Sequence, residues 1–196
     1  VVEADDDQRE YARERLHEPY RTLLGHLRHE VGHFYWDRLV KDRPALGEFR
    51  QRFGDDREDY AAAMERYYQG GPMPGWEHHH VSAYATMHSW EDWAETWAHM
   101  MHRHDTLETA TDAGLAIEYG PGGGSLTPFI GVAGAGEDEA ARFVHESGRW
   151  LGAIVIANEL SRSMGQPDTY PFTPGEEAIA KIFFAERVAT GRYGYA

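Results

Sequence analysis

The segment LGHLRHEVGHFYW, residues 24–36, carries the clearest structural pattern in the sequence. Its apolar residues recur at three- and four-residue steps, which is the spacing of one face of an α-helix. We therefore expect an amphipathic helix from about residue 20 to residue 41. The face predicted to pack against the core consists of Leu24, Leu27, Val31 and Phe34.

The same helix carries the motif H-E-x-x-H at His29-Glu30-Val31-Gly32-His33. Residues four apart lie one turn apart, so both imidazoles point to one side and their nitrogens can converge on one zinc ion. Glu30 would lie beside the metal, where its carboxylate can take a proton from a zinc-bound water. The motif predicts His29 and His33 as zinc ligands and Glu30 as the general base. Surface histidines are the alternative, because the chain contains 12 histidines.

A catalytic zinc site needs a third protein ligand, and the segment WEDWAETWAH, residues 90–99, offers three candidates. Glu91, Glu95 and His99 recur at four-residue steps and therefore share one helix face. We predict Glu95 as the ligand because the alanines beside it are small and would let the two helices pack closely. Glu91 or His99 would then orient a ligand from behind. A solvated charged face is the alternative.

Two other groups of histidines lie near these segments. His26 shares the helix sector of His29 and His33, so it could join the metal site, although a surface position is favoured. The tract His78-His79-His80 could hold a second metal or line the cleft, but an exposed loop is the favoured interpretation.

Composition excludes several classes of function. The formal net charge is -14, and an acidic surface repels phosphate backbones and anionic lipids, so we expect neither nucleic-acid nor membrane binding. The absence of cysteine excludes disulfides and thiolate zinc ligands. It also fits a reducing compartment, and we expect a cytoplasmic protein of undetermined oligomeric state.

The rest of the chain reads as one mainly helical domain over residues 1–196. Its first residue is Val1 rather than Met, which predicts a fragment that lacks upstream residues. Further helices are expected at about 90–104, 137–164 and 176–188, and residues 81–85 could form a short strand or an extended loop. The inward face of the helix at 137–164 should contain Phe143, Trp150, Leu151, Ile154, Val155 and Leu160.

Several blocks together resemble the bacterial zinc-binding metallopeptidases of the gluzincin type, over most of residues 17–172. The blocks are Leu24 to Trp36, Val81 to Ala85, Trp90 to His99, Asp105 to Ala110 and Ser161 to Phe172. In combination they are far more specific than the H-E-x-x-H motif alone.

The resemblance implies a mainly α, zincin-like (α+β) domain in which His29, His33 and Glu95 bind zinc and Glu30 is the base. It also implies that Tyr84, eleven residues before Glu95, donates a hydrogen bond to the oxyanion of the tetrahedral intermediate. A buried packing tyrosine is an equal alternative. Members usually carry a cysteine zinc ribbon and strands before the metal helix. This sequence shows neither, so we expect a small or truncated sheet.

These observations predict a zinc-dependent hydrolase that cleaves peptide bonds in a peptide or protein substrate. A non-catalytic zinc-binding or regulatory domain is one alternative, and a zinc amidase acting on a non-peptide amide is another. A water at the fourth coordination position would favour catalysis. A fourth side chain, such as His26 or His99, would favour a structural role.

Overall fold

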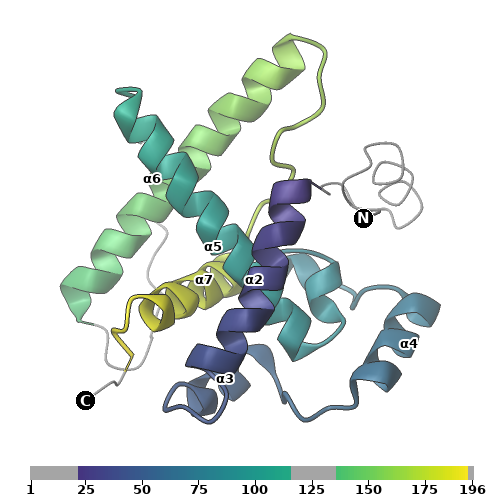
Figure 1. Cartoon of the computed structure of the whole chain (residues 1–196). Helices are drawn as coiled ribbons and strands as arrows, with labels where there is room; N and C mark the ends of the chain where they lie inside the picture. The colour runs from purple at the N-terminus through teal and green to yellow at the C-terminus, as the bar shows by residue number, and fades with distance from the viewer. Residues whose placement is uncertain (1–21, 116–135, 194–196) are drawn as a thin grey trace.

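The computed structural model describes residues 22–115 and 136–193 (Figure 1). Within these ranges the α-helices are α2 (Leu23–Leu39), α3 (Leu46–Phe53), α4 (Tyr60–Gly70), α5 (Ser89–Asp112), α6 (Glu137–Ser163) and α7 (Glu176–Ala189). The 3-10 turns η2 (Trp76–His78) and η3 (Tyr84–Thr86) connect α4 to α5. The helices expected near residues 20–41, 90–104, 137–164 and 176–188 are confirmed.

The expected α+β domain with a small sheet is wrong, because no residue in 22–115 or 136–193 lies in a strand. The candidate strand at residues 81–85 forms a turn instead. Ser82 Oγ accepts a hydrogen bond from the Ala85 backbone N–H at 3.2 Å, and η3 follows directly. A backbone donor that is used within a local turn cannot pair with a neighbouring strand.

Helix α5 is the centre of the described fold and packs against α2, α3, α6 and α7 (Figure 1). It begins after His88, whose Nδ1 accepts a hydrogen bond from the Trp90 backbone N–H at 3.0 Å. Two acidic residues follow in its first turn, where the helix dipole favours negative charge. Further along, Trp93 and Trp97 are buried in the core. One helix therefore supplies both core residues and, in its first turn, the Glu91 carboxylate that faces α2.

Ion pairs that involve buried charged side chains join α5 to the two C-terminal helices. Lys181 Nζ on α7 donates to Asp92 Oδ2 at 2.6 Å, and both side chains are buried. Arg103 donates to Glu146 at 3.0 Å and to Glu186 at 2.8 Å, which joins α5 to α6 and α7. Removing one partner of such a pair leaves an uncompensated buried charge, so these contacts hold the register of the helices.

The predicted buried face of α2 is wrong. Its four members, Leu24, Leu27, Val31 and Phe34, are all exposed, whereas His29, Gly32 and Trp36 are buried. The reason is that α2 packs on α5 through the face that contains Gly32, where the two backbones approach closely, rather than through its apolar stripe.

Gly32 is the point of closest approach between α2 and α5. A Cβ atom at this position would lie 3.0 Å from Ala94 Cα and 3.0 Å from Trp97 Cβ. Trp93 Nε1 also donates a hydrogen bond to the Gly32 carbonyl at 2.9 Å. Glycine, which has no side chain, is what allows the two backbones to approach this closely. This contact turns the two motif histidines toward the acidic turn of α5.

The inward face predicted for α6 is partly right. Phe143, Trp150 and Ile154 are buried, but Val155 and Leu160 are about 60% exposed. In the described ranges, no helix combines the length and the apolar character that crossing a membrane requires.

Candidate metal centre

Two imidazoles on successive turns of α2 converge at one wall of a cavity. The Nε2 atoms of His29 and His33 lie 3.1 Å apart, and the two rings are nearly perpendicular at 85°. Two nitrogens that bind one tetrahedral zinc at ~2.0–2.1 Å would be separated by about 3.3 Å. The pair is therefore already spaced for a shared ion.

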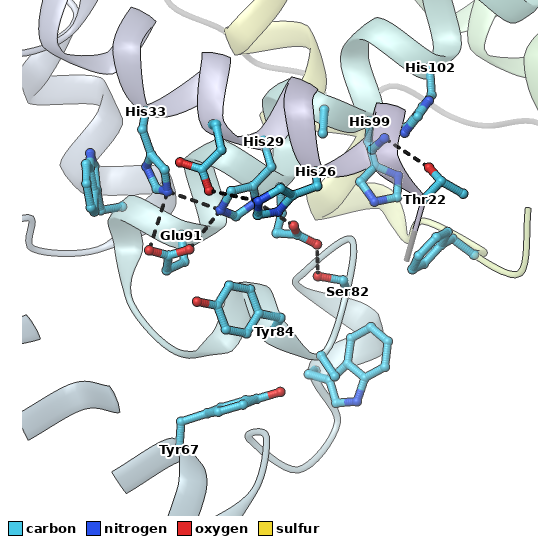
Figure 2. Close-up of a pocket in the computed structure, with 18 of the residues that line it drawn as sticks. Thr22, His26, His29, His33, Tyr67, Ser82, Tyr84, Glu91, His99 and His102 are labelled. Atoms are coloured by element: carbon cyan, nitrogen blue, oxygen red, sulfur yellow. Dashed lines mark hydrogen bonds and ion pairs between the residues drawn. The ribbon is translucent and has the colours of Figure 1, made fainter. Parts of the chain in front are cut away.

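Glu91 brings a carboxylate to the same point from the first turn of α5. One of its oxygens lies 3.0 Å from His29 Nε2, and the other lies 3.5 Å from His33 Nε2 (Figure 2). The potential ligand atoms of these three residues all lie within 4.8 Å of one another. Two imidazole nitrogens and one carboxylate oxygen form a donor set that zinc accepts in catalytic sites.

Glu95 lies on the other nitrogen of His29. Its Oε1 is 2.7 Å from His29 Nδ1, and its Oε2 accepts a hydrogen bond from Ser82 Oγ at 2.6 Å. From the sequence, Glu95 is the predicted ligand and Glu91 the residue behind. The structure instead brings the Glu91 carboxylate to the Nε2 atoms of both histidines and the Glu95 carboxylate, one helical turn further along α5, to His29 Nδ1. Which of the two binds a metal stays a prediction.

The electrostatics of the cluster fit a bound cation. Burial opposes charge on His29, but its hydrogen bonds to Glu91 and Glu95 outweigh burial and raise its pKa to about 10. Burial would raise the pKa of Glu91, yet hydrogen bonds to His29 and His33 hold it well below its usual range. Two carboxylates in a largely buried site thus require positive charge between them. A divalent ion would supply it and leave the imidazoles neutral.

These groups line a cavity of about 660 Å³. Glu30 and His26 also line this cavity, and His26 Nε2 lies 3.7 Å from Glu30 Oε1. The Glu30 side chain is about half exposed, so solvent can reach it. The lining also includes the aromatic side chains of Tyr67, Tyr68, Trp76 and Tyr84. Tyr67 and Tyr84 lie across the cavity from the histidines of α2 (Figure 2).

Tyr84 reaches the cavity, and its ring centroid lies 6.0 Å from that of His29. Its hydroxyl is hydrogen-bonded to Tyr60, and burial raises the pKa of Tyr84 far above its ordinary value. The hydroxyl is therefore protonated at neutral pH and able to donate. Its role toward an oxyanion stays a prediction.

Three residues beside this cluster were not predicted as site residues from the sequence. Tyr60 donates a hydrogen bond to Glu91 Oε1 at 2.8 Å, across 31 residues of chain. Trp90 packs on the His33 ring at 3.8 Å between centroids. Ser82 holds Glu95, as described above. Ser82 and Trp90 fall within blocks that resemble the metallopeptidases, whereas Tyr60 falls outside every motif.

Three other histidines, His79, His80 and His99, contact residues outside the cluster of His29, His33 and Glu91. His99 lines the cavity, where its Nδ1 contacts the Tyr170 hydroxyl. In the His78–His80 tract, His79 pairs with Glu177 at 2.8 Å and His80 lies 3.1 Å from the buried Asp92. These contacts join the tract to the start of α7 and to α5. Within the described ranges, the group that could hold an ion includes neither His79 nor His80.

Comparison with known proteins gives a family match over almost the whole chain. The family described as "Putative zinc-binding metallo-peptidase" matches residues 1–188. Uncharacterized proteins of Mycobacterium bovis and Mycobacterium tuberculosis are 42% identical over 190 residues, which is 96% of this chain and 52% of each relative. The chain thus spans about half the length of the curated relatives that it matches. No solved structure matches.

Proposed function

This chain belongs to that family of zinc-binding metallopeptidases, and from this premise we propose that it is a zinc-dependent hydrolase of peptide bonds. His29, His33 and Glu91 are the proposed zinc ligands, and Glu30 is the proposed general base. The convergence of two Nε2 atoms and the Glu91 carboxylate at the wall of a cavity carries the proposal.

Glu95 takes the role of orienting His29. A carboxylate on Nδ1 keeps the proton on that nitrogen, so Nε2 keeps its lone pair for the metal. Ser82 holds the other oxygen of Glu95 and so fixes the direction of the carboxylate. On the same face of α5, Glu91 therefore binds the metal and Glu95 orients the ligand His29.

The number of protein ligands supports catalysis over a structural role. In residues 22–115 and 136–193, the group that could hold an ion contains three residues and no fourth. His26 is paired with Glu30, and His99 with Tyr170. Catalytic zinc sites have three protein ligands and keep one position for water or substrate, whereas structural sites fill all four with side chains.

Each part of the cavity has a defined task in hydrolysis. When bound, zinc would polarise the scissile carbonyl and lower the pKa of a water toward ~7. Glu30 takes the proton of that water and passes it to the leaving amine. The aromatic side chains that line the cavity bind side chains of the peptide through apolar contact.

Cleavage of a peptide library by the zinc-loaded protein tests this function. We expect cleavage with zinc, none after chelation, and loss of cleavage with retained zinc in Glu30→Gln. Glu108→Gln is the matched control, because Glu108 is exposed on α5 and does not line the cavity. Full cleavage by Glu30→Gln would overturn the mechanism. Cleavage of small non-peptide amides but of no peptide would identify an amidase instead.

A further inference from the structure

Tyr60 is the first residue of α4, a helix that is remote from the metal motifs in sequence. Asp59 caps this helix by accepting a hydrogen bond from the Ala62 backbone N–H at 2.7 Å. The Tyr60 ring packs edge-on against His88 and Trp90, with centroid distances of 5.4 and 5.9 Å. The cap and the two rings fix the direction of the phenol, which points at Glu91.

The Tyr60 hydroxyl connects two groups of the site. It donates to Glu91 Oε1 at 2.8 Å, and it is also hydrogen-bonded to the Tyr84 hydroxyl. A phenol has one proton, so donation to Glu91 leaves Tyr60 to accept from Tyr84. The hydrogen bonds therefore run from Tyr84 to Tyr60 to Glu91, from the aromatic lining of the cavity to the carboxylate proposed as a ligand.

We propose that Tyr60 is a positioning residue for zinc, which orients the Glu91 carboxylate through its hydroxyl group. The inference rests on the ligand set of the proposed function but not on catalysis. With one Glu91 oxygen held by Tyr60, the other oxygen is directed at His29 Nε2, 3.0 Å away. Partners that hold a ligating carboxylate in this way contribute to metal affinity although they never touch the metal.

Zinc affinity, measured by competition with a chromogenic chelator, tests the inference without any substrate. Tyr60→Phe keeps the ring between His88 and Trp90 and removes only the hydroxyl. We expect it to weaken zinc binding about 10- to 100-fold, in line with other residues that support metal ligands. The melting temperature of the metal-free protein should change little, because the packing of the ring is kept.

Two further variants separate positioning from a general effect of the cavity. Tyr68→Phe removes a hydroxyl from the same helix and the same cavity, and Tyr68 is largely exposed. We expect its zinc affinity to equal that of the wild type. Tyr84→Phe breaks the hydrogen-bond chain one step away from Glu91, so its effect should be smaller than that of Tyr60→Phe.

The outcomes distinguish this inference from the proposed function. Wild-type zinc affinity in Tyr60→Phe, or an equal loss in Tyr68→Phe, would overturn the role of Tyr60 and leave the ligand set intact. Absence of zinc binding by the wild-type protein would overturn both. Zinc binding without cleavage of any peptide would overturn the proposed function alone.

Discussion

The Glu95 carboxylate lies 2.7 Å from Nδ1 of His29, so the ring nitrogen that faces the cavity is the other one, Nε2. An imidazole held in this way presents its lone pair in a fixed direction. The geometry gives the two carboxylates different positions, with Glu91 at His29 Nε2 and Glu95 at His29 Nδ1.

Glutamine substitutions at the two carboxylates should therefore differ in their effect on zinc. Glu91→Gln removes a charged ligand and should nearly abolish binding, whereas Glu95→Gln should weaken it about 10- to 100-fold. Chelator competition measures both affinities. The reverse order, with Glu95→Gln more damaging than Glu91→Gln, would make Glu95 the ligand.

Gly32→Ala should destabilise the protein by about 1–3 kcal/mol, because the added methyl group would overpack the contact with Ala94 and Trp97. Chemical denaturation measures the change. Gly47→Ala in α3 is the matched control, since a Cβ at Gly47 meets no atom within 4 Å. That variant should be neutral or stabilised, because alanine favours helix over glycine by about 1 kcal/mol. Equal stability of the two variants would refute the close contact.

The stability of the metal-free protein should fall in mild acid through His99. Burial lowers the pKa of His99 to about 4, below its ordinary 6.5. Between these two pH values His99 is protonated in the unfolded chain but not in the folded protein. It therefore lowers the free energy of unfolding by up to about 1.4 kcal/mol for each pH unit of acidification. Its stabilising effect is present above pH 6.5 and is lost as the pH falls toward 4.

Urea denaturation between about pH 7 and pH 5 checks this contribution. His99→Gln removes this imidazole, so the free energy of unfolding should depend less on pH in this variant than in the wild type. His104→Gln, at an exposed position of the same helix, should not. The difference between the variants isolates His99 from His29, whose raised pKa acts in the opposite direction. An unchanged slope in His99→Gln would contradict the burial argument.

Trp76→Ala should weaken the binding of peptide substrates. Removing the contact of one large aromatic ring costs about 1.5–3 kcal/mol, or roughly tenfold or more in KM, for peptides with bulky apolar side chains. Zinc content should stay at the wild-type level, because Trp76 lines the cavity but does not belong to the group that could hold an ion. A uniform loss of activity toward all peptides, small side chains included, would argue against an apolar subsite.

Local sequence patterns were sufficient to predict the positions of the main helices and the convergence of the two motif histidines. The spacing of His29 and His33 encodes their convergence, since four residues make about one helical turn. Helical periodicity cannot identify the third ligand in the same way, because Glu91 and Glu95 lie on the same face of α5, one turn apart. The choice depends on how far α5 slides along α2, which the Gly32 contact determines.

Other features depend on tertiary contacts that no local pattern encodes. The apolar stripe of α2 reads as a core face, but the close approach at Gly32 turns it outward. Tyr60 reaches Glu91 across 31 residues, from a helix without a recognisable motif. Residues 81–85 form no strand because a local turn forms at Ser82, where a strand and an extended loop were both compatible with the sequence.

Trp90 packs on the His33 ring, with 3.8 Å between the ring centroids, so metal binding at this site should change the intrinsic tryptophan fluorescence. Indole emission is sensitive to the charge state of an imidazole in contact with it, and a cation captured by His33 alters that charge distribution. Titration followed by intrinsic fluorescence would therefore report occupancy without a label. Trp90→Phe would identify which of the six indoles carries the signal.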